Sequence, residues 1–226
     1  GSGLALGGMA FQALFRNPLA TPFTLGVSGG AAFGAALYMR LGVSFALLGI
    51  PGSNWSAFAG AAAVIALVFA LTRARGGFAT PTLLLAGVAL SFFLSSMILA
   101  LQYSSSLHDS FRLVRWLMGG LGMVGYDAVF NILPLVVTGA VVILMLTNEL
   151  NLLSVGEDLA MSRGLDVSRI KKLLFFAVSF MIGGIVAVCG PIGFVGMMVP
   201  HICRLLVGAD HRRLFPATLL FGGMFL

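Results

Sequence analysis

The sequence predicts an all-α polytopic membrane protein, and three observations carry this prediction. Of its 226 residues, 59% are hydrophobic and only 9% are charged, whereas soluble domains are roughly 45–50% apolar and about 25% charged. The mean hydropathy is +1.07. Several stretches without any charge are at least as long as the roughly 20 residues that a membrane helix needs. A water-soluble fold could not bury so much apolar surface.

The charge-free stretches and the turn signals between them locate the expected helices. Asn54 is expected to cap a helix that begins at Trp55, and Thr80 a helix that begins with Pro81. The segment 190–193 contains two glycines and a proline, which predicts a further turn. The predicted spans are 3–15, 23–39, 55–72, 81–102, 127–148, 172–189 and 193–207, with another that starts near Leu214.

The basic residues are divided unevenly between the two sides that alternating spans create. The side with more of them is cytoplasmic by the positive-inside rule, and their scatter among apolar spans argues against a nucleic-acid partner. The chain begins and ends in apolar sequence and shows no signal peptide, so we expect part of a longer subunit. The cytoplasmic set is Arg16, Arg73, Arg75, Arg163, Arg169, Lys171, Lys172, Arg204, Arg212 and Arg213, and the outer set is Arg40, Arg112 and Arg115.

No catalytic or metal-binding pattern stands out. Ser28 lies in a glycine-rich segment, 26–30, whose spacing misses G-x-S-x-G by one residue. An intramembrane protease would also need a histidine facing that serine, and His201 lies toward the cytoplasmic end of its span. The three histidines are far apart, and no phosphate-binding G-x-x-x-x-G-K-[ST] is present. A nucleotide-driven process would therefore need a separate nucleotide-binding partner.

The largest cytoplasmic loop predicts two short helices. The segment 156–164 places acidic residues in a first turn and Arg163 in a last turn, which suits the helix dipole, and Gly164 ends the helix. A second short helix is expected to start within 165–169. These helices could simply cap the bundle, or they could form a docking surface for a cytosolic subunit.

Two further segments carry open alternatives. The outer stretch 107–121 contains Arg112, Arg115 and Trp116 at the spacing of an interfacial helix, which fits either an aromatic belt with snorkelling arginines or a mouth that meets an external partner or substrate. Ser91 and Ser95 lie one helical turn apart. They could face a transport pathway or a dimer seam, or bond their own helix backbone.

A set of motifs follows one order across nearly the whole chain. They are Gln12–Pro22 with Leu25–Ser28, Leu84–Leu90, Trp116–Gly120, Gly156–Gly164, and Gly190–Arg204 followed by Gly208 and Asp210–Arg212. Together and in this order they resemble the permeases that import iron–siderophores, haem and cobalamin. Two departures are Gly120, where many members have serine, and the absence of the family's arginine pair before the second helix, which meets the binding protein.

The resemblance implies a fragment of the ten-helix bundle of a type II ABC importer permease. Residues 1–226 would form one transmembrane domain, from the second helix to the start of the ninth, with a cytoplasmic coupling loop at 154–171. It implies a homodimer in the bacterial cytoplasmic (inner) membrane, two cytosolic ATP-binding subunits and an extracytoplasmic substrate-binding protein. The chain itself would bind no cofactor or metal, since ATP and Mg belong to the partner ATPase.

The resemblance, taken with the patterns above, also assigns roles to particular residues. The residues expected to couple the chain to the ATPase are Gly156, Glu157, Asp158, Arg163, Gly164 and Arg169. Those expected to line the pathway and its outer gate are Ser91, Ser95, Tyr103, Ser104 and Ser105. Arg112 and Arg115 substitute for the missing arginines that dock the binding protein. The structural motif residues are Asn17, Pro18, Gly193, Pro200, His201 and Arg204.

The expected function is import of an iron–siderophore-type metal chelate by alternating access. Haem and cobalamin are alternative substrates within the same family. Two alternatives from other classes are an ATP-independent channel and an intramembrane enzyme that uses Ser28 or His201.

Overall fold

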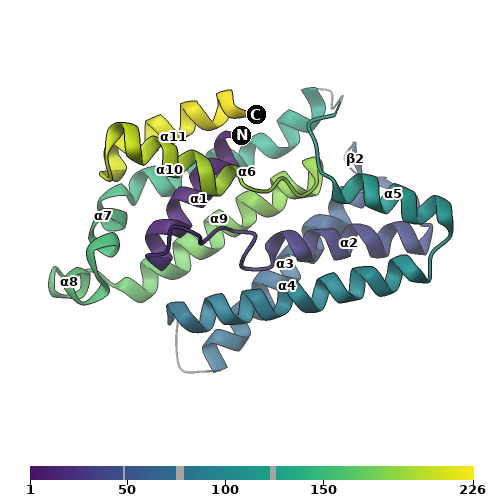
Figure 1. Ribbon diagram of the computed structural model, residues 1–226, viewed down its shortest axis with the longest axis horizontal. Coiled ribbons are helices and arrows are strands. Elements are labelled where there is room, and N and C mark those ends of the chain that lie inside the picture. Colours follow the sequence, from purple (N-terminus) through teal and green to yellow (C-terminus); the bar gives the residue numbers. More distant parts are fainter. Residues whose placement is uncertain (48, 75–78, 123–125) are drawn as a thin grey trace. The chain divides into compact units, whose positions relative to one another are not determined.

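The computed structural model describes residues 1–47, 49–74, 79–122 and 126–226, which form helices and one short hairpin (Figure 1). Arg75, one of the predicted cytoplasmic cations, lies outside the described residues. The helices are α1 (Ser2–Phe15), α2 (Val27–Leu41), α3 (Gly52–Ala74), α4 (Thr80–Tyr103), α5 (Leu107–Leu117), α6 (Tyr126–Met145), α7 (Thr147–Val155), α8 (Glu157–Ser162), α9 (Val167–Cys189), α10 (Val195–Val207) and α11 (His211–Phe225), and the strands are β1 (Ala46–Leu47) and β2 (Ile50–Pro51).

The residues group into two compact units, and α6 and α9 contribute to both. The first unit comprises Gly1–Pro22, Leu135–Ile182 and Gly193–Leu226. Within it α1 packs against α7, α10 and α11 and is buried along almost its whole length. A side chain at Gly8 would collide with the backbone carbonyl of Gly196. Small residues therefore let α1 and α10 approach at backbone distance, as in many membrane bundles.

The second unit comprises Phe23–Pro134 and Gly183–Ile192. Its helices α2, α3 and α4 lie side by side, and α5 packs on α2 and α4 (Figure 1). Gly30 and Gly60 face each other, because a side chain on either would meet the backbone carbonyl of the other. The Ser56 hydroxyl donates a 2.8 Å hydrogen bond to the Gly34 carbonyl one turn further along.

Four described helices, α3, α4, α6 and α9, are long and apolar enough to cross a membrane, and α1 and α10 are shorter apolar helices. All of them follow predicted spans. Helix α2 begins four residues later than predicted, since Phe23–Gly26 forms a turn that ends with Gly26 at φ 80°. The prediction of an all-helical, multi-span membrane protein is confirmed.

Three local predictions are wrong. Asn54 does not cap α3, because the antiparallel β1–β2 hairpin reverses the chain earlier and the helix begins at Gly52. Thr80 is the first residue of α4 and not its cap, a position taken by Ala79, with Pro81 still in the first turn. The expected second short helix at 165–169 is instead the start of the long helix α9, which begins at Val167.

Helix α7 was not foreseen. The predicted span 127–148 ends at Met145, and Leu146 separates α6 from α7. The chain is apolar up to Leu146 and polar over 147–149, so hydropathy places the end of the span to within a few residues but does not show that a new helix begins at once.

Candidate functional site

The coupling segment, residues 156–169, is built around the short helix α8. Gly156 has extended backbone angles and stands between α7 and α8. Gly164 adopts φ 82°, and its N–H donates to the Met161 carbonyl at 2.9 Å. This left-handed conformation suits glycine. The predicted helix within 156–164, with Glu157 and Asp158 in its first turn, is confirmed.

A partly buried ion pair ties α8 to α9. The Lys171 ammonium lies 2.6 Å from a Glu157 carboxylate oxygen, and their side chains are 3% and 36% exposed. Lys171 belongs to α9, where its neighbours at positions three, four and seven further on, Leu174, Phe175 and Val178, are all buried. A buried ammonium needs such a partner, because its desolvation is costly. The ion pair therefore fixes the start of α8 on α9.

The two predicted coupling arginines are exposed on either side of this junction. Arg163 is the C-terminal cap of α8, and Arg169 lies in the first turn of α9. The Asp166 carboxylate accepts a 3.0 Å hydrogen bond from the Arg169 backbone N–H and so caps α9. The segment consequently presents Asp158, Arg163 and Arg169 on a surface whose backbone is held by capping and by the Glu157–Lys171 pair.

The two predicted pathway serines in α4 lie in different surroundings. The Ser91 hydroxyl donates to the Gly87 carbonyl at 2.8 Å, within its own helix. Ser91 is half-buried and faces the start of α2, where a side chain on Gly26 would approach its hydroxyl at 3.4 Å. Ser95 is exposed. Only Ser95 of the two is therefore open to a pathway or a partner.

The serine turn after α4 reverses the chain into α5. The Ser104 and Ser105 hydroxyls donate to the Leu101 carbonyl at 3.0 and 2.6 Å. Ser106 caps α5, since its hydroxyl oxygen accepts a 3.2 Å hydrogen bond from the Asp109 N–H. Tyr103 ends α4 and is 96% exposed. The turn is thus held by local hydrogen bonds, and its tyrosine points to the surroundings.

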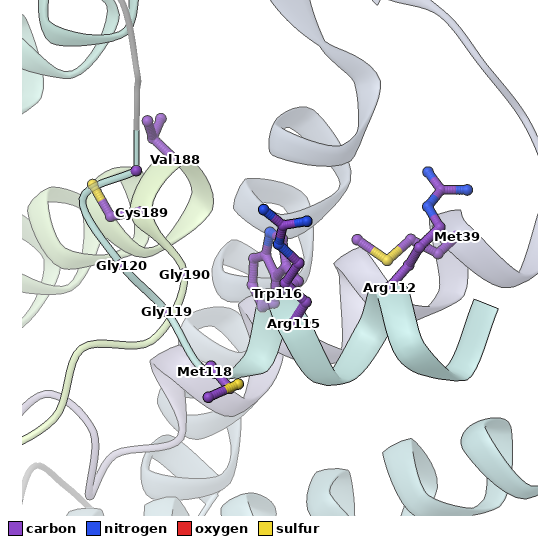
Figure 2. A pocket seen from close by; sticks show the side chains of 11 residues that line it. Met39, Arg112, Arg115, Trp116, Met118, Gly119, Gly120, Val188, Cys189 and Gly190 are labelled. Atoms are coloured by element: carbon purple, nitrogen blue, oxygen red, sulfur yellow. The ribbon is translucent and has the colours of Figure 1, made fainter. Parts of the chain in front are cut away.

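Arg112 and Arg115 line a cavity of about 690 Å³ within the second unit, here named the outer pocket because α5 is predicted to lie on the outer side. Figure 2 shows both guanidinium groups and Trp116 on α5, with Met39 of α2 and Cys189 of α9 around the same space. On the other side of α5, Leu113 is 3% exposed and packs with Ala32, Ala36 and Ile98. The helix predicted within 107–121 is present, with an apolar anchor on one side and exposed arginines on the other, and its place at the membrane interface stays a prediction.

The structural motif residues of the first unit form a hydrogen-bonded group. Gln12, only 3% exposed, donates to the Met197 carbonyl and accepts from the Arg204 guanidinium, both at 3.2 Å. The Asn17 carboxamide oxygen accepts from the Leu19 N–H at 2.9 Å in the turn that contains Pro18. Arg204 therefore joins α10 to α1, and Asn17 shapes the turn that follows α1.

The other motif residues shape the start and middle of α10. Gly193 lies in the loop before Phe194, which is exposed and adopts φ 65°, an unusual angle for a residue with a side chain. Pro200 is buried within α10, whereas His201 is exposed. An exposed His201 fits no catalytic constellation seen among the described residues.

A second polar group surrounds the start of α11. The His211 Nδ1 lies 2.7 Å from the Asn151 carboxamide oxygen, and the amide nitrogen of Asn151 donates to Asp210 at 2.7 Å. Hydrogen bonds from the Arg212 N–H and from Asn151 lower the pKa of Asp210. Burial, with a contribution from nearby Arg204, lowers the pKa of His211 to about 4, so His211 is neutral at pH 7 with its proton on Nδ1.

Sequence reasoning missed Lys171 and Gln12 as site residues. The charge pattern treats Lys171 only as a cytoplasmic cation, although its spacing with Leu174 and Val178 places it on the buried face of α9. Gln12 enters the sequence prediction only as part of a matching motif. A single carboxamide in the apolar helix α1 indicates a buried polar contact, and that signal was available.

The fold and these sites define a class, a polytopic helical membrane protein with a structured, charged loop on one side. A family model, the FecCD transport family, matches residues 1–226. The chain belongs to the FecCD transport family, and the resemblance seen in its motifs is confirmed.

Curated relatives cover the whole chain. The ABC transporter permease protein YvrB of Bacillus subtilis is 39% identical over 230 residues, and the cobalamin import system permease protein BtuC of Halobacterium salinarum is 41% identical over 226 residues. The hemin transport system permease protein HmuU of Yersinia pestis is 36% identical over 228 residues, 68% of its length. The chain spans 64% of the length of YvrB and 60% of that of the Halobacterium BtuC.

A solved structure shares the fold. It is an inward-facing conformation of a metal-chelate type ABC transporter, with a TM-score of 0.89 and 34% sequence identity. The match covers the whole chain and 71% of the solved chain. The chain therefore has the fold of part of a FecCD-type permease bundle.

Proposed function

We propose that this chain is the membrane-spanning permease of an ATP-driven importer that carries a metal chelate into the cytoplasm by alternating access. The observation that carries the proposal is the family match along all 226 residues. Residues 1–226 then act as one transmembrane permease domain, with 154–171 as its cytoplasmic coupling loop. The chain is a transport subunit and not an enzyme, and ATP with Mg is bound by a partner.

The assembly we propose is a homodimer with two cytosolic ATP-binding subunits and an extracytoplasmic substrate-binding protein, in the bacterial cytoplasmic membrane. Among the similar proteins are a cobalamin and a hemin permease, and the similar structure is of metal-chelate type. We favour an iron–siderophore chelate as the substrate, with haem or cobalamin as the alternative. Arg112 and Arg115 are proposed to face the extracytoplasmic side, where the binding protein docks.

The coupling segment supports a mechanical role. A partner that binds the exposed Arg163 and Arg169 would move α8, and the Glu157–Lys171 ion pair would pass this motion to α9. Ser95, Tyr103 and the serine turn of α4 are proposed to line the pathway and its outer gate. Ser91, which bonds within α4, would contribute to packing beside that gate.

The decisive experiment is charge reversal in the coupling segment. The full-length protein with Arg163→Glu or Arg169→Glu is reconstituted with its ATPase and binding protein. We expect at least a tenfold loss of both transport and substrate-stimulated ATP hydrolysis, with an unchanged circular dichroism spectrum. Arg73→Glu, at an exposed arginine in the last turn of α3, is the matched control.

Coupled transport at the normal rate in both reversal variants would contradict the proposal. The channel alternative predicts substrate or ion flux without ATP, which electrical recording on the reconstituted protein detects. The enzyme alternative requires Ser28 or His201, and unchanged transport in Ser28→Ala and His201→Ala excludes it.

A further inference from the structure

The outer pocket has the size of a small-molecule site. Its volume of about 690 Å³ lies within the roughly 300–1,000 Å³ of typical ligand pockets. Its walls come from the end of α2, from α5 with the loop after it, and from the end of α9, all in the second unit. The described lining residues thus all belong to one compact part of the chain.

The charge of the pocket is positive and uncompensated. Among the described residues that line it, Arg112 and Arg115 are charged and none is acidic. Within residues 1–47, 49–74, 79–122 and 126–226, no ion pair joins Arg112 or Arg115 to an acidic side chain. Asp109, on the same helix, accepts a 2.8 Å hydrogen bond from Ser106 at the start of α5. Both guanidinium groups are therefore exposed to an outside anion.

The backbone holds the pocket open. The Gly120 N–H donates a 2.9 Å hydrogen bond to the Cys189 carbonyl. Gly119 and Gly190 adopt φ 64° and 69°, and a side chain on Gly190 would approach the Trp116 carbonyl at 2.7 Å. Glycines at this contact let the loop after α5 lie directly on the end of α9. The floor is thus bare backbone, which adds no side chain to the pocket.

The chemistry of the walls selects the ligand. Two arginines three residues apart on one helix can each bind a carboxylate through two parallel N–H···O hydrogen bonds. Trp116 offers a flat apolar face beside them, and the Met39 thioether is an adaptable apolar contact. We infer that the outer pocket binds a carboxylate-bearing metal chelate through Arg112 and Arg115, and that the substrate is therefore anionic. This inference rests on the proposed function.

The inference separates the candidate substrates by their chemistry. Ferric citrate-type chelates and haem carry free carboxylates, whereas cyanocobalamin carries amide side chains and no free carboxylate. An anionic substrate also predicts that binding weakens as the salt concentration rises, because exposed charges are screened.

The test is direct binding to the full-length permease in nanodiscs, without its binding protein. Iron(III)–citrate and haem are the probes, measured by equilibrium dialysis, with cyanocobalamin as the competitor. We expect Arg112→Ala and Arg115→Ala each to raise Kd about tenfold. Arg115→Lys should give a smaller loss, since it keeps the charge without the fork. Arg40→Ala, at an exposed arginine next to Met39 that does not line the pocket, should stay within twofold.

A variant of the floor tests the shape of the pocket independently of its charge. Gly119→Ala places a side chain against the Pro191 carbonyl at a position with φ 64°. We expect it to weaken binding of both probes while Arg112 and Arg115 remain in place. Folding of every variant is checked by its melting temperature.

Three results would overturn the inference. The first is that neither anionic probe binds. The second is that the Arg112→Ala/Arg115→Ala double variant binds the probes as tightly as the wild type. The third is that cyanocobalamin displaces a bound probe as well as the unlabelled probe does. Loss of binding-protein capture in that double variant, with probe binding unchanged, would assign the arginines to docking. The inference would then fail. The proposed function would still stand if the wild type transports its substrate with ATP and the Arg163 and Arg169 variants do not.

Discussion

The coupling segment and the outer pocket use basic side chains in opposite ways. Lys171 is buried and paired with Glu157, so its charge is satisfied inside the chain. Arg112 and Arg115 are exposed around an open cavity without an acidic lining residue among those described. The first arrangement joins two helices, whereas the second leaves charge available to a ligand. A basic residue is thus informative about function only when its burial and its partners are known.

The largest expected effect on stability comes from breaking the Glu157–Lys171 ion pair. Glu157→Gln leaves the Lys171 ammonium buried without its carboxylate, so we expect a loss of about 3 kcal/mol in unfolding free energy. Lys171→Met should cost less, because Glu157 is 36% exposed and keeps contact with water. SDS-induced unfolding in mixed micelles measures both changes. The exchange Glu157→Lys with Lys171→Glu should recover part of the loss, and no recovery would mean that the pair itself contributes little.

The second effect tests the backbone contact in the outer pocket. Gly190→Ala adds a methyl group 2.7 Å from the Trp116 carbonyl, at a φ of 69° that disfavours alanine. We expect a loss of about 2 kcal/mol, measured in the same unfolding experiment. Gly193→Ala is the control, because a side chain there would meet no heavy atom within 4 Å. Equal losses in the two variants would show that the close contact is unimportant.

The third effect is a dependence of stability on pH that comes from His211 in the first unit. His211 has a pKa of about 4 in the folded chain and about 6.5 when unfolded. As the pH falls, His211 binds a proton in the unfolded chain before it does so in the folded chain. The free energy of unfolding therefore decreases from about pH 6.5 down to pH 4. We expect a loss of about 1 kcal/mol between pH 7 and pH 5.5. His211→Asn should flatten this dependence, whereas His201→Asn, at an exposed histidine, should leave it unchanged.

The smallest effects come from the helix caps of the two regions. Asp166 caps α9 beside the coupling segment, and Ser106 caps α5 beside the outer pocket. Alanine at either position should cost at most about 1 kcal/mol. We expect Ser106→Ala to weaken chelate binding slightly and Asp166→Ala to weaken coupling slightly. The reverse pattern in binding and ATPase assays would contradict the separate roles of the two regions.

Hydropathy and turn residues predicted most of the helices, since a bilayer demands long apolar segments. They could not locate the break at Leu146 or the early turn before Gly52, because local hydrogen bonds decide these points. Motif order predicted the family and the coupling helix α8. The ion pair of Glu157 with Lys171 joins residues 14 positions apart, and only the packing of α9 brings them together. The outer pocket likewise depends on the approach of Gly119 and Gly190.

The facing glycines Gly30 and Gly60 have a consequence for how the protein is made. Helices α2 and α3 are neighbours in the chain, and their closest contact is between two backbones. Apolar side chains gain little free energy by moving from lipid tails to a helix interface. Close packing of backbones is therefore a main source of attraction between membrane helices. We therefore expect α2 and α3 to pair as soon as both have entered the bilayer, before α4 packs against them. They would form the first stable piece of the second unit during synthesis.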